Sequence, residues 1–227
     1  MVAFSGADPI GVLIGAKRPS GTLIHRIAVH PDHRRQGHGR HLLTSLSSKL
    51  AILGPPRMVA EVPDTFDAAR GLFGASGYVE EERLTDYVAD DAGVRDVAGG
   101  GFVIPVTVGD LEANGLLRDA LPHICWERAF DTLMARKDEL EGLAVASDES
   151  IEAYVLHAGG EILSLRSLVE DGRARLTQLL SHLRARGTNS FRFPKVHPAE
   201  ISKELLETLG FRPAGAHLRY AAKARSA

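Results

Sequence analysis

Two glycines and three arginines occur together in the segment Arg34-Arg35-Gln36-Gly37-His38-Gly39-Arg40. Glycines one residue apart allow the backbone to approach a ligand closely. The segment lies between an expected strand, 22–29, and an expected helix, 42–53, in which leucines recur at helical spacing. Unpaired amides at the start of that helix, the helix dipole and the arginine charges favour a bound anion. The segment therefore predicts a site for a pyrophosphate group.

Other phosphate-binding motifs and a nucleic-acid partner do not fit this sequence. The segment lacks the Gly-Lys-Ser/Thr ending of a Walker loop, and no Gly-x-Gly-x-x-Gly fingerprint occurs. The formal net charge is −2, whereas a surface that follows a phosphate backbone needs a basic excess. We therefore expect a small phosphorylated ligand and no nucleic acid.

The stretch 27–43 resembles the acetyl-CoA motif of GNAT N-acetyltransferases, in which Arg/Gln-x-x-Gly-x-Gly/Ala follows a strand ending in Val-x-Pro. Arg34, Gly37 and Gly39 fill that pattern here. A second motif of the family, a helix that closes on Gly-Phe/Tyr, is matched by residues 69–78. The close match covers roughly residues 10–90, and the rest of the chain is similar to the family only in its order of elements.

The resemblance implies an N-acetyltransferase that moves an acetyl group from its cosubstrate acetyl-CoA to a primary amine by direct attack. It implies that backbone groups of Ile27 and Val29 pair with the pantetheine arm and that amides from Arg34 or Arg35 through Arg40 hold the pyrophosphate. The expected cofactor-binding residues are Ile27, Val29, Arg34, Arg35, Gln36, Gly37, His38, Gly39 and Arg40.

The expected acid and base are less complete than in many GNAT enzymes. The position on the strand that often carries a base holds His25, and an imidazole titrates near neutral pH. The alternative is a surface histidine at the edge of a hairpin. Where many members have a tyrosine that protonates the leaving thiolate, this sequence has Phe73, which cannot donate a proton. Tyr78 fills a core position, and Tyr87 has no motif to support it.

Metals, disulfides and membranes are not expected. Five histidines lie between His25 and His41, but the family resemblance explains their layout without a metal ion. The single cysteine, Cys125, fits a buried structural thiol in a reducing, cytoplasmic setting. The N-terminus does not read as a signal peptide, and no apolar stretch reaches membrane-spanning length.

The order of expected elements repeats once along the chain. In the first half, strands 10–14 and 22–29 form a hairpin, followed by helix 42–53, strand 58–62, a helix carrying residues 68–73, and two strands, one starting at 77–79 and one over 84–89. A polar linker covers 90–101. In the second half the matching elements are 151–156, 161–165, 176–183, 190–194 and 201–209. Strand 102–108 and a helical stretch, 111–140, have no counterpart in the first half.

This repeat predicts an α/β (α+β) fold of two GNAT-like domains, each a mixed twisted sheet flanked by helices. Residues 1–92 would form the acetyl-CoA-binding domain, which is short at its N-terminus, and 93–227 a degenerate domain. A second domain or another subunit would cover the gap in the first, unless the sequence starts late. The loop at 169–174 lacks Gly-x-Gly and carries Glu170 and Asp171, so we expect no CoA there.

Several questions stay open at the level of sequence. The acceptor amine, small molecule or peptide, is not named by any motif. A catalytically inactive acetyl-CoA- or CoA-binding protein is the first alternative to an enzyme, and an interaction scaffold that binds no CoA is the second. The tandem layout is compatible with a monomer that acts as an internal pseudo-dimer and with a homodimer.

Overall fold

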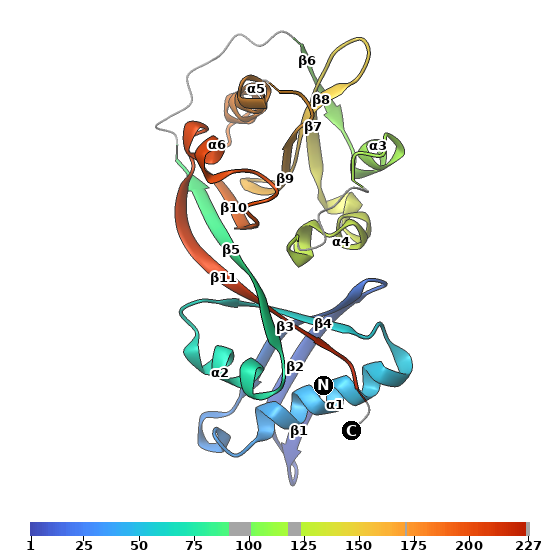
Figure 1. The fold of residues 1–227 in the computed structure, drawn as a ribbon, viewed down its shortest axis with the longest axis vertical. Helices are drawn as coiled ribbons and strands as arrows, with labels where there is room; N and C mark the ends of the chain where they lie inside the picture. The colour runs from blue at the N-terminus through green and yellow to red at the C-terminus, as the bar shows by residue number, and fades with distance from the viewer. Residues whose placement is uncertain (91–100, 118–123, 171, 226–227) are drawn as a thin grey trace. The chain divides into compact units, whose positions relative to one another are not determined.

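The structure is a computed structural model, and it describes residues 1–90, 101–117, 124–170 and 172–225. The chain forms two compact units (Figure 1). Unit 1 comprises Met1–Arg83 together with His217–Ala227, and unit 2 comprises Leu84–Ala216. The predicted linker falls largely on 91–100, outside the described residues. The division at residue 92 stays a prediction about where the sequence repeat begins.

Unit 1 is a sheet with two helices, in the strand order β1-β2-β3-β4-β11-β5. Strands β2 and β3 form the expected hairpin, and β3 runs parallel to β4. The bounds of the elements are β1 Val2–Ser5, β2 Asp8–Arg18, β3 Gly21–Val29, η1 Pro31–His33, α1 His38–Leu53, β4 Arg57–Pro63, α2 Asp67–Ala75, β5 Val79–Ala89 and β11 Arg212–Lys223.

The last strand of the chain completes the sheet of unit 1. Strand β11 pairs antiparallel with β4, from His217 opposite Pro63 to Lys223 opposite Arg57. It lies between β4 and β5, so the C-terminal residues fill an internal place in the sheet. The sequence predicted that the second domain or another subunit would cover the gap left at the N-terminus of the first. The described residues show instead a strand supplied to the middle of its sheet.

The core of unit 1 lies between the sheet and helices α1 and α2. Most of the leucines that predicted α1 are buried there, and the buried aromatic residues come from α2, from the turn before β5 and from β11. Phe73 of α2 contacts Tyr78 edge-on at a centroid distance of 5.1 Å and stacks on Tyr220 of β11 at 5.8 Å. The C-terminal strand therefore contributes to the hydrophobic core of unit 1 as well as to its sheet.

Unit 2 has the strand order β5-β10-β9-β8-β7-β6, with helix α5 against strands β7, β8 and β9. Its core contains two clusters of buried side chains. The bounds of its remaining elements are β6 Phe102–Val106, α3 Val108–Ala113, η2 Trp126–Arg128, α4 Phe130–Ala135, η3 Lys137–Glu139, β7 Glu141–Ala146, β8 Ile151–Ala158, β9 Glu161–Ser167, α5 Gly172–Ala185, β10 Phe191–Val196 and α6 Lys203–Thr208.

The same β-bulge occurs in the hairpin of each unit. In unit 1, the pairing shifts between Ile14 and Gly15 of β2, which leaves His25 of β3 without a partner. In unit 2, the pairing shifts between β8 residues Leu156 and His157, which leaves Leu163 of β9 without a partner. Each bulged residue lies four positions before the end of its strand. The sequence repeat thus extends to a local irregularity of the backbone.

Helices α2 and α6, each of which is followed by a strand, also end in the same way. Gly77 and Gly210 are left-handed, with φ of 79° and 86°. The amides of the next residues, Tyr78 and Phe211, each donate to the carbonyl five positions back, at 3.1 and 3.0 Å. This arrangement ends a helix in a residue that favours glycine. The resemblance between Gly77-Tyr78 and Gly210-Phe211 in the sequence therefore reflects one shared helix terminus.

Three sequence-based assignments need correction. The strands expected from 77–79 and over 84–89 are one continuous strand, β5. The helical stretch expected over 111–140 is broken into α3, η2, α4 and η3, with 118–123 outside the described residues. Strands β1, β7 and β11 were not expected at all.

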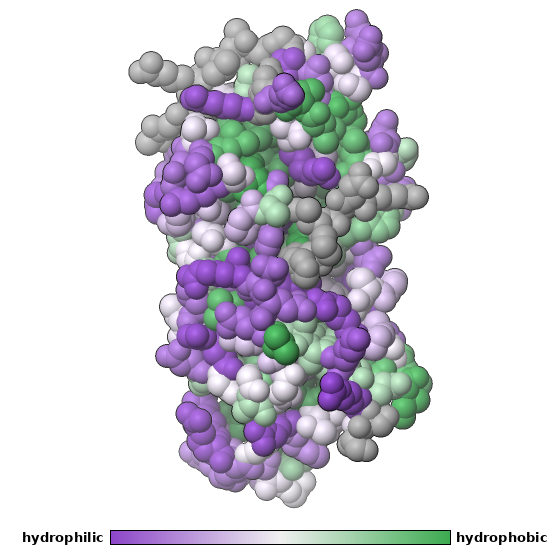
Figure 2. All heavy atoms as spheres, viewed as in Figure 1, coloured by the Kyte–Doolittle hydropathy of each residue, from purple (hydrophilic) through white to green (hydrophobic). Residues whose placement is uncertain are grey.

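Hydrophilic side chains cover much of the face drawn in Figure 2, and hydrophobic residues gather in separate patches. Among the described residues, no helix is both long enough and apolar enough to cross a membrane.

Candidate functional site

Strands β3 and β4 separate soon after they begin. They are paired in parallel only at Thr22 with Met58 and at Leu23 with Val59. Beyond Leu23, the β4 side of β3 has no strand partner in the described part of the sheet. The bulge at His25 follows directly. Bulges re-aim side chains and end pairing, so the local irregularity and the opening of the sheet coincide.

The backbone groups of Ile27 and Val29 point into this opening. In an antiparallel pair, successive residues alternate between facing the partner strand and facing away from it. His30 donates its backbone N–H to the Ile10 oxygen at 2.8 Å, so residues in step with His30 face β2. Ile27 and Val29 alternate with His30 along the strand, so their backbone groups face the side on which β4 no longer pairs with β3. They are therefore placed to bind an extended ligand by their main chains.

The side chain of Arg34 already forms a hydrogen bond with one of these backbone groups, the Val29 oxygen. Its Nε donates to the Val29 oxygen at 3.1 Å. The loop is closed farther on by Gln36, whose Nε2 donates to the Asp32 oxygen at 3.1 Å. The first contact holds a guanidinium against the open strand edge, and the second turns the Gln36 amide back toward the preceding turn.

The loop has a backbone conformation suited to an anion. Arg35 and Gly37 have φ values of 63° and 87°, and Gly37 is the N-cap of α1. Left-handed residues in a turn can direct neighbouring N–H groups into one concavity. No side chain caps α1, and no acidic residue lies in its first turn. The amides and the positive end of the helix dipole therefore face a ligand without a competing carboxylate.

Gly39 allows helices α1 and α2 to approach closely. A Cβ at this position would lie 3.1 and 3.2 Å from the two methyl carbons of Leu72. At Gly37, by contrast, a Cβ would meet nothing within 4 Å, so its requirement for glycine is conformational. Arg40 joins the same two helices, because its Nη2 donates to the Ala75 oxygen at 2.8 Å.

A pocket of about 790 Å³ joins all these features. All the predicted cofactor-binding residues except Gln36 line it. Further lining residues come from β3, from η1, and from α2 and the turn before it, and none of these was predicted as a cofactor-binding residue. They are Ala28, His33, Thr65, Phe66, Asp67, Ala68, Ala69, Gly71, Leu72 and Ala75. Small residues at 68, 69, 71 and 75 were the available sequence signal, because they leave room beside a helix.

The predicted base and the alternative acids do not line this pocket. His25 is exposed at the bulge of β3. Phe73 and Tyr78 are in the core, and Tyr78 donates its hydroxyl to the Met58 sulfur at 3.5 Å. Burial raises the pKa of Tyr78. Tyr87 lies in the core of unit 2.

Tyr220 is a tyrosine that sequence reasoning did not consider. It comes from β11, is buried, and donates its hydroxyl to Glu80 at 3.0 Å. Burial raises its pKa, and a hydrogen bond with Arg70 opposes that effect. The residue does not line the pocket, so its visible role is to join β11 to β5 and α2.

The histidines near the loop contact one another without forming a metal-binding group. His30 and His38 each make an edge contact with His33, at centroid distances of 5.9 and 6.1 Å. Among the residues that the structure describes, no group of three or more His, Cys, Asp or Glu side chains is arranged to hold a metal ion.

Comparison with known proteins identifies the first unit. Residues 1–80 match the family model described as the acetyltransferase (GNAT) domain. This range contains the open strand pair, the loop and both helices that line the pocket.

Solved GNAT structures match almost the whole chain. A proposed acetyltransferase from Pyrococcus horikoshii has a TM-score of 0.67 and 16% identity, over 99% of this chain and 73% of the other. A tandem GNAT protein from the clavulanic acid biosynthesis pathway has a TM-score of 0.64 and 17% identity, over 100% and 82%. A GCN5-related N-acetyltransferase from Sphaerobacter thermophilus has a TM-score of 0.66 and 14% identity, over 97% of this chain and 78% of the other.

These matches confirm the expected α/β fold, a mixed twisted sheet flanked by helices, and the resemblance that predicted it. At this level of identity, the solved structures establish the fold, and the sequence match within residues 1–80 establishes the domain. Residues 1–80 form a GNAT acetyltransferase domain, in a chain that has the GNAT fold throughout.

Proposed function

We propose that unit 1 binds acetyl-CoA in the pocket between β3, α1 and α2 and transfers its acetyl group to a primary amine. One observation carries this proposal. The unpaired edge of β3, the left-handed loop and the start of α1 all line one pocket of about 790 Å³. A long ligand with a pyrophosphate at one end and amide groups along its length fits that combination.

The charges of the pocket lining support the pyrophosphate. Arg34, Arg35 and Arg40 are among its residues. The one carboxylate among the described lining residues is Asp67, and it is paired with Arg70 at 3.1 Å. The balance is therefore positive beside the start of α1, where the backbone amides also gather.

The amides of the pantetheine arm would pair with Ile27 and Val29, as an added strand pairs with a sheet edge. Arg34 must then leave the Val29 oxygen, and its guanidinium becomes available to the pyrophosphate. The thioester would lie toward the bulge, at the end of the opening next to the paired part of β3 and β4.

In the reaction, the amine nitrogen attacks the thioester carbonyl carbon, the carbon–sulfur bond breaks, and the thiolate leaves. The proton lost by the amine balances the proton gained by the thiolate. We propose that His25, exposed at the bulge, takes the amine's proton directly or through water. Phe73 supplies no proton, so the thiolate would be protonated by water or by the amine's own proton. Holding the two reactants together supplies much of the barrier reduction.

Unit 2 is proposed not to bind CoA. Strands β9 and β10 also separate, since they pair only at Glu161 with Arg192. The buried Arg128 from η2 donates to the carbonyls of Pro194 and Lys195 on β10, and η2 contacts β9. The chain itself therefore occupies part of the opening that in unit 1 is vacant.

A CoA-binding protein without turnover is the second candidate, and the buried Phe73 favours it. The two are separated by measuring thiol release from acetyl-CoA with a panel of polyamines, aminoglycosides, amino acids and peptides. An enzyme gives amine-dependent release that follows protein concentration and is lost in Gly37→Glu. Binding of acetyl-CoA without release for any amine would favour the second candidate. The control is Gly187→Glu, a glycine of unit 2 with φ of 96° and nothing within 4 Å of its Cβ position.

A further inference from the structure

A second, smaller cavity lies inside unit 2. Its volume is about 140 Å³, and its polar lining comes from Arg128, Tyr154, Ser164, Arg166 and Glu200. We propose that this cavity is a binding site for a short-chain carboxylate. The proposal does not rest on acetyl-CoA binding in unit 1, because no residue is shared between the two pockets.

Two hydroxyl groups of the cavity have no hydrogen-bond partner among the described residues. Tyr154 is 1% exposed and Ser164 is 7% exposed. Neither side chain makes a hydrogen bond within the part of the chain that the structure describes. Neither hydroxyl oxygen is among the fully buried, unpaired polar atoms of the described residues, so both oxygens are accessible to a molecule in the cavity. Both groups line the cavity, where a ligand with acceptor atoms would satisfy them.

Arg166 brings a positive charge to the same wall. It lies on β9 directly opposite Tyr154 of β8, and such partners point to the same face of a sheet. Its Nη1 donates to the Leu116 oxygen at 3.2 Å. No carboxylate among the described residues lies within ion-pair distance of it. Its guanidinium therefore keeps donor capacity for an anion.

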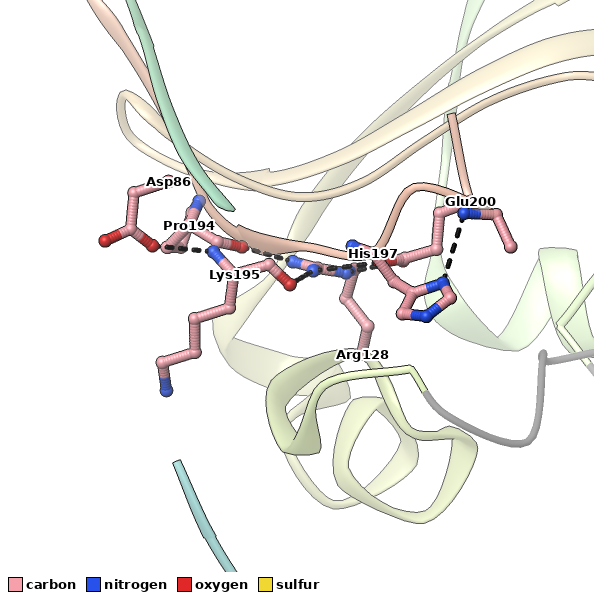
Figure 3. Close-up of polar contacts among 7 residues, drawn as sticks. Asp86, Arg128, Pro194, Lys195, His197 and Glu200 are labelled. Atoms are coloured by element: carbon pink, nitrogen blue, oxygen red, sulfur yellow. Dashed lines mark hydrogen bonds and ion pairs between the residues drawn. The ribbon is translucent and has the colours of Figure 1, made fainter. Parts of the chain in front are cut away.

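Another part of the cavity wall is the ion pair between Arg128 and Glu200 (Figure 3). Arg128 is 1% exposed in its side chain, and its Nε and Nη2 donate to the two oxygens of Glu200 at 2.7 and 3.1 Å. Its Nη1 donates to the Pro194 oxygen at 2.8 Å. The His197 amide donates to Glu200 at 2.8 Å, so both carboxylate oxygens are engaged. Burial alone would lower the pKa of Arg128, but Cys125 and Glu200 raise it, and the guanidinium stays charged.

The charge and the polarity of this lining indicate which class of ligand would fit. Arg128 and Glu200 cancel each other, so the described lining residues together carry the single positive charge of Arg166. The Tyr154 and Ser164 hydroxyls and the remaining N–H groups of Arg166 can all donate, which matches the acceptor oxygens of a carboxylate. The other lining residues that the structure describes are apolar, among them Leu117, Ile124 and Leu133, and suit a short alkyl chain. The volume holds only a few heavy atoms, far fewer than CoA.

The test measures binding of propionate and of propionamide to the full chain by calorimetry, at ionic strength held constant with sodium chloride. The two ligands have nearly the same shape and differ in charge. We expect saturable binding of propionate, with propionamide at least tenfold weaker. In Arg166→Gln the affinity for propionate should fall at least tenfold, and in Ser164→Ala severalfold. Arg186→Gln, an exposed arginine of the same unit, should bind as the wild type does, and so should Gly37→Glu.

Three results would overturn the proposal: no saturable binding of propionate, equal affinity for propionate and propionamide, or an unchanged affinity in Arg166→Gln. Urea unfolding of each variant reports whether it is folded. Should Arg166→Gln not fold, Ser164→Ala decides, because it removes one hydroxyl and leaves the charged groups in place. An unchanged affinity in that variant would then count against the site. Loss of propionate binding in Gly37→Glu alone would place the site in unit 1.

Discussion

Arg34 donates through its Nε to the backbone oxygen of Val29 at 3.1 Å, and so covers the strand edge on which a pantetheine arm would pair. The contact joins the two parts of the proposed cofactor site, the loop that would hold phosphates and the strand that would hold amides. A cofactor that pairs with β3 would therefore compete with the Arg34 guanidinium for the Val29 oxygen. A bound cofactor would replace one internal hydrogen bond and gain a charged partner.

Replacing Arg34 by methionine is expected to weaken acetyl-CoA binding about tenfold, because a hydrogen bond to a charged group contributes roughly 1.5–3 kcal/mol and part of this is offset by freeing Val29. The affinity should also depend less on salt, since one cation is lost. Calorimetry at low and high salt measures both effects. Arg186→Met, at an exposed position of unit 2, is the matched control. Equal affinities for Arg34→Met and the control would argue against phosphate contact at Arg34.

The close approach of Gly39 to Leu72 predicts a steric effect on stability. Gly39→Leu should lower the free energy of unfolding by about 1–3 kcal/mol, the usual cost of overpacking. The loss should be smaller when Leu72→Ala is present, because the two residues share one space. Gly74→Leu in α2 is the control, since a Cβ there meets nothing within 4 Å. Additive effects in the double variant, measured by urea unfolding, would contradict the packing argument.

His25→Gln tests the proposed base. We expect kcat/KM for the amine to fall at least tenfold, a typical share for general base catalysis, with acetyl-CoA affinity unchanged. The profile of kcat/KM against pH should also lose the rising part that depends on the base. His41→Gln, an exposed histidine of α1 outside the pocket, should behave as the wild type does. A variant at His25 that keeps the wild-type pH profile would show that His25 is a surface residue of the hairpin.

Tyr78 predicts how stability depends on alkaline pH. Burial raises the pKa of its hydroxyl in the folded state above the value of about 10 in the unfolded chain. The folded state therefore holds the proton longer, and the stability it contributes is complete below about pH 10 and is lost as the pH rises further. In Tyr78→Phe the fall above pH 10 should be shallower. A smaller fall should remain from Tyr87 and Tyr220, whose pKa values burial also raises. Urea unfolding from pH 8 to 11 measures it, and identical slopes would contradict the assignment.

The loop and the elements around it were readable because their signals are local. The two glycines, the leucines of α1 and the Gly77-Tyr78 terminus each act within a few residues. The structure places the resulting site residues together, with Gln36 as the exception because its amide turns to the Asp32 oxygen. The α2 residues of the pocket were missed, because small residues at 68, 69, 71 and 75 do not by themselves show that this face of the helix meets a ligand.

Strand β11 was missed because its partner is far away in the sequence. Its residues include Ala214, Gly215 and Ala216, which have little preference for strands, and it pairs with β4 near the other end of the chain. Strand β5 was divided in two because its middle is polar. In the structure, Glu80 accepts from Tyr220 and Glu81 pairs with Arg57 at 2.6 Å, so partners on neighbouring elements stabilise a polar stretch as strand.

The most direct test of the account is the thermal shift produced by acetyl-CoA in the wild type, Gly37→Glu and Gly187→Glu. Both glycines are left-handed with open space at the Cβ position, so the substitutions bring similar backbone strain and the same charge. At a hundredfold excess over Kd, binding to the folded state stabilises it by about 2.7 kcal/mol. The account predicts a shift in the wild type and in Gly187→Glu and none in Gly37→Glu. No shift in the wild type, or the same shift in Gly37→Glu, would contradict an acetyl-CoA site at this loop.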